Sequence, residues 1–143
     1  MSKLPIVTIN RSAFTLTFWR LDKTNRFRQV REFPIAIGQI GHETPTGMYF
    51  VESKTHHPDW KAPDSDWVPE EERNHIFPFD DPRNPFAGGF ISIDSQDGVG
   101  IHGTKFEPQV GQAVSHGCIR MEVPSLLWLY NRLPNYSPVF IYD

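Results

Sequence analysis

Short β-strand patterns separated by turn residues fill the first part of the chain, and they constrain it to a mainly β fold. The segments 6–9 and 13–19 combine alternation with β-branched and aromatic residues, as short strands do. Polar turn sequences follow at 10–12 and 22–25, and a third strand is expected at 26–32. Three strands joined by short turns indicate consecutive β-hairpins.

The second half of the chain contains the one clear helical pattern. Strands are expected at 90–94 and 99–102, on either side of an Asp-Gly turn. Apolar residues at positions 126, 127, 130 and 133 fit one face of a short helix, with Pro124 near its first turn and Pro134 after its last. We therefore expect mainly strands, with one or two short helices.

A long loop insertion is expected at about residues 53–89. This segment is rich in Pro, Asp, Glu and His, yet it has too many aromatic residues for a disordered linker: Trp60, Trp67, Phe77, Phe79 and Phe86. Loops of this length are unusual in a compact domain and often serve function, so we expect an ordered segment over a cleft. A short helix is expected near 69–74. The adjacent His56 and His57 of the insertion are interpreted as solvated side chains, and no metal site is expected.

Composition excludes several classes of partner. The 143-residue chain has a net charge of −3 and scattered basic residues, so neither nucleic acid nor an anionic membrane surface is expected to bind it. No apolar run is long enough to span a bilayer, so we expect no membrane insertion. The N-terminus lacks a signal-peptide pattern, which indicates a trimmed form or non-classical delivery.

The most reactive sequence lies at 115–120, Ser-His-Gly-Cys-Ile-Arg, which contains the only cysteine of the chain, Cys118. A thiol needs a nearby base or positive charge to become a thiolate, and its attack on a carbonyl needs donors for the oxyanion. Gly117 leaves room for a substrate to approach the backbone. If the segment is extended, His116, Cys118 and Arg120 share one face. These features indicate a cysteine acyltransferase or hydrolase.

The residues alone leave two questions open. The base could be His116 or His102, which lies upstream in a second His-Gly pair. A lone cysteine is also often only a small buried hydrophobe, although its polar neighbours here argue against a core strand. A zinc site made with His42 or His102 is disfavoured because structural zinc prefers several cysteines.

Four ordered blocks of the sequence resemble the L,D-transpeptidase catalytic domain of the YkuD type. They are Thr-Pro-Thr-Gly at 44–47, Asn-Pro at 84–85, the pair Ile-His-Gly-Thr at 101–104 with Ser-His-Gly-Cys-Ile-Arg at 115–120, and a closing strand at 137–142. The resemblance implies a YkuD-like β-sandwich or meander and a single catalytic domain over residues 1–143. It also implies peptidoglycan stem peptides as substrates, carbapenems as covalent inhibitors and no cofactor. We expect a monomer that works in the cell envelope, the periplasm or outside the cell.

The resemblance assigns catalytic roles residue by residue. Cys118 is the nucleophile and His102 the base, with the Gly103 carbonyl orienting the imidazole. The N–H groups of Gly117 and Cys118 contribute to the oxyanion hole, while His116 supports the site by hydrogen bonding.

Three further residues are expected to bind substrate or support its binding. They are Arg120, Ser115 and Thr104. The Arg120 guanidinium is expected either to hold a carboxylate of the stem peptide or to pair with an acidic neighbour.

The implied reaction has two steps. The thiol attacks the carbonyl before the terminal D-alanine of a tetrapeptide stem, and an amine then resolves the thioester to give a 3-3 cross-link or attachment to a protein. Attack by water instead would make the protein an L,D-carboxypeptidase or a lytic peptidoglycan hydrolase. A third hypothesis is a non-catalytic module that binds the cell wall.

Overall fold

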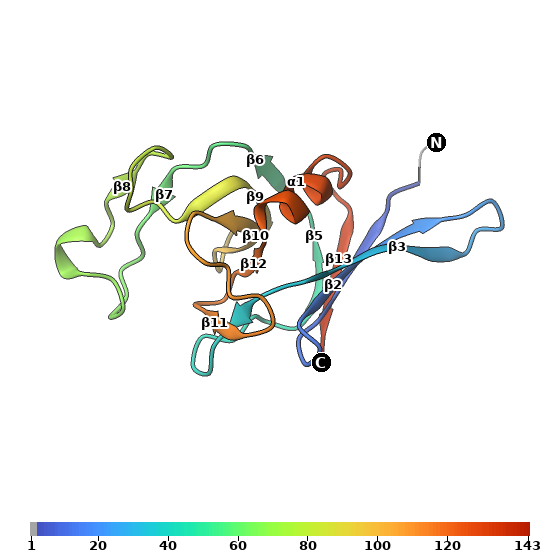
Figure 1. The fold of residues 1–143 in the computed structure, drawn as a ribbon, viewed down its shortest axis with the longest axis horizontal. Coiled ribbons are helices and arrows are strands. Elements are labelled where there is room, and N and C mark those ends of the chain that lie inside the picture. Colours follow the sequence, from blue (N-terminus) through green and yellow to red (C-terminus); the bar gives the residue numbers. More distant parts are fainter. Residues whose placement is uncertain (1–2) are drawn as a thin grey trace.

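The largest element of the computed structural model, which describes residues 3–143, is a five-stranded sheet that we call sheet A (Figure 1). Its strands, in spatial order, are β3 (Phe27–Pro34), β2 (Thr15–Leu21), β1 (Ile6–Asn10), β13 (Pro138–Tyr142) and β5 (Gly47–Phe50). Strands β1 and β13 run parallel, and the other neighbours are antiparallel. The hairpin of β2 and β3 projects from the body of the molecule.

The second sheet, sheet B, carries His102 and Arg120. Its four strands, in spatial order, are β12 (Ile119–Met121), β10 (Val99–Thr104), β9 (Phe86–Asp94) and β6 (Ser53–Thr55). Strands β10 and β12 are parallel, whereas β9 is antiparallel to both β10 and β6. The helix α1 (Val123–Tyr130) follows β12 and contacts β9 and β10.

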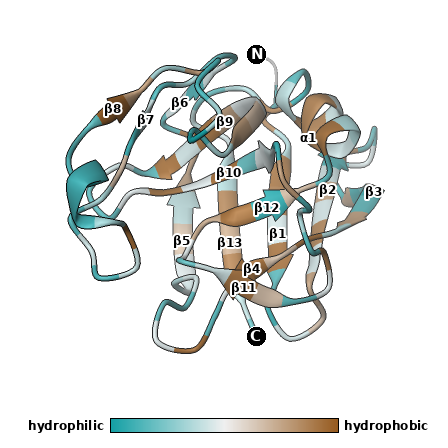
Figure 2. Cartoon of the chain, turned by 60° about the vertical axis from the view of Figure 1, so that its left-hand side comes forward, coloured by the Kyte–Doolittle hydropathy of each residue, from teal (hydrophilic) through white to brown (hydrophobic). Residues whose placement is uncertain are grey.

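One apolar core joins the two sheets and the helix. Alternate residues of each strand point into it, as expected for sheets with one buried face. The core includes Val7, Ile9, Leu16, Phe18, Val139 and Ile141 of sheet A, Ile91, Ile93, Ile101 and Ile119 of sheet B, and Leu126 and Leu129 of α1. Figure 2 shows this apolar character as brown on α1 and β13. One face of sheet B therefore packs on sheet A and α1 through this shared core.

Four short strands lie outside these sheets. Strand β4 (Ile37–Gly38) pairs in parallel with β11 (Ala113–Ser115), and β7 (Trp60–Lys61) pairs with β8 (Ile76–Phe77). The second pair belongs to the predicted insertion, together with the 3₁₀ helix η1 (Glu70–Glu72).

The insertion has a small core of its own, away from the main one. Ala62, Val68 and Phe77 are buried in it, and Trp60 packs against them. The two ends of the predicted range 53–89 lie in strands β6 and β9 of sheet B, so the part that leaves the sheets is 56–85. This part projects from one end of the molecule (Figure 1).

The mainly β prediction is confirmed, and most strands begin within two residues of the expected position. The helix prediction is right in place but wrong in detail. The helix begins at Val123 and ends at Tyr130, so its inward face carries Leu126, Leu129 and Tyr130, while Leu127 is exposed. Leu126 and Tyr130 lie on the face expected for them, and Leu129 takes the place expected for Leu127.

The described residues 3–143 contain no helix that is both long and apolar enough to cross a membrane.

Candidate active site

The parallel pairing of β10 and β12 brings two distant motifs together. His102 of β10 pairs with Arg120 of β12, and Ile101 pairs with Ile119. Both isoleucines are fully buried in the core, so His102 and Arg120 occupy the opposite face of sheet B. Cys118 immediately precedes β12, and its Sγ lies 3.4 Å from the carbonyl oxygen of Gly98, before β10. The thiol, the imidazole and the guanidinium thus gather on two adjacent strands.

His102 is buried and held in one orientation. Its Nδ1 lies 2.7 Å from the carbonyl oxygen of Gly103, so Nδ1 carries the proton and Nε2 is left with a free lone pair. The rings of Phe86 and Phe90 pack against it, with centroids 4.8 and 5.9 Å away. Burial lowers the pKa of His102 to about 4, against a smaller opposing effect of the Gly103 hydrogen bond. The imidazole is therefore neutral at pH 7.

Two glycines of β10 allow this packing. A Cβ at Gly100 would lie 2.3 Å from the Phe90 ring, and a Cβ at Gly103 would lie 2.3 Å from the carbonyl oxygen of Ala87. The pairing of β9 and β10 also shifts register between His102 and Gly103. Sequence reasoning missed Gly100 and Phe90, although a glycine inside a strand signals close approach of another group.

The segment before the nucleophile is a bend and not a strand. Strand β11 ends at Ser115, and Gly117 has a φ of +127°, which non-glycine residues rarely adopt. Ser115 Oγ donates to the carbonyl oxygen of Cys118 (2.6 Å) and accepts from the N–H of Gly117 (3.2 Å). The prediction that His116 shares an extended face with Cys118 and Arg120 is therefore wrong, because the turn at Gly117 interrupts the alternation.

The Cys118 thiol is partly buried and uncharged at rest. Burial raises its pKa above the ordinary value, while a hydrogen bond from the Gly100 backbone and the charge of Arg120 oppose the shift. Within residues 3–143 the thiol forms no hydrogen bond with His102 or His116. Catalytic hydrogen bonds are often formed only when substrate binds.

His116 lies on the outer side of the bend and contacts the insertion. Its ring stacks on Trp67, with ring centroids 3.8 Å apart and ring planes 9° apart. The ring of His42 contacts it edge to face, with centroids 4.9 Å apart. Its Nε2 lies 3.4 Å from Nε2 of Gln39. Burial and the nearby His42 and Arg120 lower the pKa of His116. The insertion thus reaches the segment that carries the nucleophile.

Arg120 forms no ion pair in the described part of the chain. The ion pairs found there join Arg11 to Asp143, Arg28 to Asp22 and Arg83 to Asp81. The guanidinium is half-buried and donates no hydrogen bond among residues 3–143, and burial lowers its pKa. Of the two expected roles for Arg120, pairing with an acidic side chain is therefore not what the structure contains.

Thr104 is the last residue of β10, two positions after His102. It is buried, and its Oγ1 accepts a hydrogen bond from the N–H of Phe106 (3.2 Å). With Glu107 and Glu122 it lines a hollow of about 410 Å³. Thr104 thus lies at the end of the face that carries His102.

The family model of the L,D-transpeptidase catalytic domain, YkuD, matches residues 5–141 of this chain. The chain belongs to the YkuD family. Among curated relatives, it is 31% identical to the L,D-transpeptidase YkuD of Bacillus subtilis over 94% of this chain and 64% of that protein. It is 34% identical to the L,D-transpeptidase ErfK/SrfK of Escherichia coli over 80% of this chain and 37% of that protein. The chain therefore spans less than two thirds of these relatives.

Solved structures of L,D-transpeptidases have the same fold. One from Mycobacterium smegmatis is 18% identical and superposes with a TM-score of 0.72 over 97% of this chain and 58% of that chain. L,D-transpeptidase 3 from Mycobacterium tuberculosis, in complex with a faropenem-derived adduct, is 23% identical, with a TM-score of 0.70 over 97% of this chain and 60% of that chain.

Two other blocks of the YkuD-type pattern have structural partners that sequence reasoning did not find. Asn84 is fully buried; its Nδ2 donates to the carbonyl oxygens of Pro58 and Phe77, and its Oδ1 accepts from the N–H of Phe86. It therefore fixes the base of the insertion to β9. Thr44 is fully buried as well, and its hydroxyl hydrogen-bonds to the bend before Cys118. The bonds from Asn84 to Pro58 and from Thr44 to Gly117 join positions 26 and 73 residues apart, so no local sequence pattern predicts them.

No group of three or more His, Cys, Asp and Glu side chains within the described range 3–143 is arranged to hold a metal ion.

Proposed function

We propose that this chain is the catalytic domain of a peptidoglycan L,D-transpeptidase that works in the cell envelope. In this proposal Cys118 takes the acyl group of a tetrapeptide stem and passes it to an amine acceptor, making a 3-3 cross-link or attaching the stem to a protein. The observation that carries the proposal is the meeting of Cys118 with a buried, oriented His102 at adjacent strands. Membership of the YkuD family supports it.

The activation step transfers one proton. Both the thiol and the imidazole are neutral at pH 7, so the resting site is not a preformed thiolate–imidazolium pair. In this step Cys118 Sγ gives up its contact with the Gly98 carbonyl, and Nε2 of His102 takes its proton as the sulfur attacks. A low imidazole pKa favours return of this proton to the leaving group.

The acylation and transfer steps then balance. Attack forms a bond from sulfur to the carbonyl carbon before D-alanine, and the proton on His102 Nε2 passes to the departing D-alanine amine as the C–N bond breaks. In the second step an acceptor amine attacks the thioester and loses a proton to His102, the C–S bond breaks, and His102 returns that proton to the departing Cys118 sulfur. No redox change or cofactor is required.

The backbone beside the sulfur supports one oxyanion donor. The N–H of Cys118 has no hydrogen-bond acceptor among residues 3–143, whereas the N–H of Gly117 already donates to Ser115 Oγ. Within this segment the Cys118 N–H is thus the donor available to a tetrahedral oxyanion. The expected contribution of the Gly117 N–H would first require loss of its bond to Ser115.

Arg120 is proposed to bind a carboxylate of the peptide stem. Its guanidinium shares a face of sheet B with His102 and is half-buried without an acidic partner in the described chain. A partly desolvated cation without a partner favours an anionic ligand, and the guanidinium geometry suits a carboxylate.

Intact-protein mass spectrometry with a carbapenem tests the nucleophile. The wild type should gain the mass of one carbapenem, and Cys118→Ala should gain none, with iodoacetamide labelling of the wild type as the control for a free thiol. An adduct on both proteins would exclude Cys118 as the site of acylation. A wild type that is alkylated by iodoacetamide but never acylated would contradict an acyl-transfer function.

Product analysis separates the alternatives on the same scaffold. Release of tripeptide stems without any amine-linked product would identify an L,D-carboxypeptidase or lytic hydrolase. Tight binding to peptidoglycan with no acyl adduct would identify a non-catalytic wall-binding module.

A further inference from the structure

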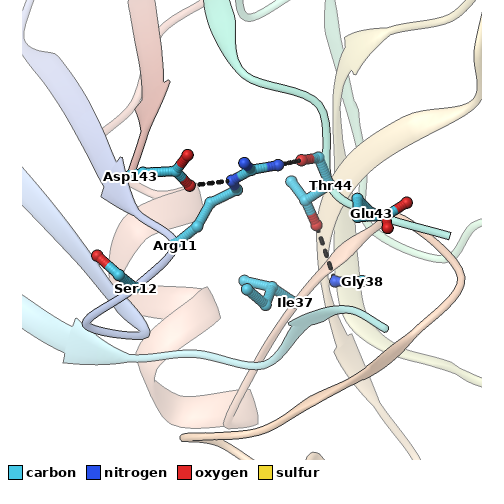
Figure 3. Close-up of a pocket in the computed structure, with 7 residues that line it drawn as sticks. All are labelled: Arg11, Ser12, Ile37, Gly38, Glu43, Thr44 and Asp143. Carbon is cyan, nitrogen blue, oxygen red and sulfur yellow. Dashed lines mark hydrogen bonds and ion pairs between the residues drawn. The ribbon is translucent and has the colours of Figure 1, made fainter. Parts of the chain in front are cut away.

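Thr44 is a buried hydroxyl that joins two backbone segments. It is fully buried; its Oγ1 accepts a hydrogen bond from the N–H of Gly38 (2.9 Å) and donates one to the carbonyl oxygen of Gly117 (2.8 Å). Figure 3 shows the bond with Gly38. Because a hydroxyl has one proton, the donor bond of Thr44 is committed to Gly117.

The backbone of Thr44 is itself anchored. Arg11 Nη1 donates to the carbonyl oxygen of Thr44 (2.5 Å), and Arg11 Nε forms an ion pair with Asp143 (2.7 Å) (Figure 3). Arg11 lies in the turn after β1, and Asp143 follows β13. The ends of two neighbouring strands of sheet A thus hold Thr44 in place, beside a hollow of about 220 Å³.

The bond from Thr44 sets the direction of the next N–H. The peptide between Gly117 and Cys118 is trans, as are all those described in residues 3–143, and a trans peptide points its C=O and N–H to opposite sides. With the Gly117 carbonyl directed at Thr44, the Cys118 N–H points away from Thr44. Ser115 holds the groups on either side, the Gly117 N–H and the Cys118 carbonyl.

The only backbone group of this peptide pair left without a described partner is therefore the N–H beside the nucleophilic sulfur. We infer that Thr44 is a positioning residue for the oxyanion hole: its hydroxyl holds the Gly117–Cys118 peptide so that the Cys118 N–H faces the reacting carbonyl. This inference rests on the proposed acyl-transfer function. Thr44 touches neither the substrate nor the sulfur, and it acts through the Gly117 carbonyl.

Three variants separate positioning from general stability. Thr44→Val removes the hydroxyl and keeps the shape of the side chain, and Thr44→Ser restores the hydroxyl. Ser137→Ala is the matched control, because Ser137 is also fully buried and its Oγ also donates to a backbone carbonyl, that of Pro134 (2.6 Å), before β13. All three are compared with the wild type by melting temperature.

Two rates are measured on each protein. Acylation of Cys118 by a carbapenem builds a tetrahedral oxyanion, whereas alkylation of the same thiol by iodoacetamide does not. Because loss of one oxyanion donor slows a reaction about 10²–10³-fold and Thr44→Val only misdirects the donor, we expect acylation to fall about 10–100-fold. Alkylation should stay within about twofold, Thr44→Ser should recover most of the acylation rate, and Ser137→Ala should acylate like the wild type at a similar loss of melting temperature.

Several outcomes would overturn the inference. They are a Thr44→Val protein that acylates at the wild-type rate, an equal fall of acylation and alkylation, or an equal loss of acylation in Ser137→Ala. Failure of the proposed function gives a different result, since the wild type itself would then be alkylated but not acylated, and the role of Thr44 would fall with it.

Discussion

His102 and Cys118 both lie in surroundings that disfavour charge. Burial lowers the pKa of the histidine to about 4 and raises the pKa of the cysteine. Reactive cysteines often have a lowered pKa instead, which keeps them as thiolates. In the proposed mechanism the thiol becomes nucleophilic when a proton moves to His102 during attack.

The buried histidine makes stability depend on pH. Its pKa is about 4 in the folded chain and about 6.5 in an unfolded chain, so between these values the unfolded state binds more protons. The free energy of unfolding should therefore be fully retained above about pH 6.5 and fall as the pH drops toward 4, with His102 contributing about 3 kcal/mol of the loss. Urea denaturation from pH 4 to 7 should show a steeper fall in the wild type than in His102→Gln.

A second variant controls for the removal of a histidine as such. His75 is exposed, so His75→Gln should keep the wild-type profile. Parallel profiles for the wild type and His102→Gln would show that His102 is not buried as a neutral group.

The unpaired guanidinium of Arg120 predicts a charge-specific effect on substrate. Arg120→Gln should lower kcat/KM for a tetrapeptide stem by about 10–100-fold, because a hydrogen bond to a charged group contributes about 1.5–3 kcal/mol. The assay compares the free stem with stems in which each carboxylate is converted to an amide. The loss should shrink for the amide that removes the bound carboxylate, and Arg26→Gln, on the exposed β2–β3 turn, should behave as wild type. An equal loss with every amide would argue against carboxylate binding.

Among the elements, the segment 56–85 has only a small apolar core of its own. Its base is tied to β9 by Asn84, and Trp67 stacks on His116 beside the nucleophile. Its own core contains only Ala62, Val68 and Phe77 with Trp60. A segment with so few buried contacts is expected to open locally more readily than the sheets.

Loss of Asn84 should loosen this segment selectively. Asn84→Ala leaves two buried carbonyls and one N–H without their partner, which we expect to cost about 2–3 kcal/mol. Hydrogen exchange followed by mass spectrometry should be faster over 56–85 and unchanged in β1 and β2. Asn131→Ala, at an exposed position after α1, is the control and should leave exchange over 56–85 unchanged. Faster exchange throughout the molecule would mean that Asn84 supports the whole fold and not this segment.

The same elements show how far the sequence could predict the structure. Strand β1 was expected at 6–9 and is found at Ile6–Asn10. It could be predicted because its alternation and the turn residues after it are local signals. An extended segment was one possibility at 116–118, but the structure has a bend there. The positive φ of Gly117 goes with bonds made by Ser115 and Thr44, which the local sequence does not reveal. The bond between Thr44 and Gly117 spans 73 positions, so no local pattern could predict it.

At the scale of the whole molecule, the site lies where the two sheets support each other. The residues that flank it in sequence, Ile101 and Ile119, are part of the core shared with sheet A. Arg11, which follows β1 of sheet A, also binds Thr44, and Thr44 in turn binds Gly117 beside Cys118. Rigid support from both sheets suits a reaction that needs a fixed geometry among a thiol, an imidazole and one N–H.

The most direct test of the account is the conversion of tetrapeptide muropeptides by the whole chain, with an amine acceptor present, followed by liquid chromatography and mass spectrometry. The wild type should release D-alanine and form amine-linked products, whereas Cys118→Ala should form neither. A folded wild type with a free, titratable thiol that leaves tetrapeptide stems unchanged would contradict the account, as would amine-linked products formed equally by Cys118→Ala.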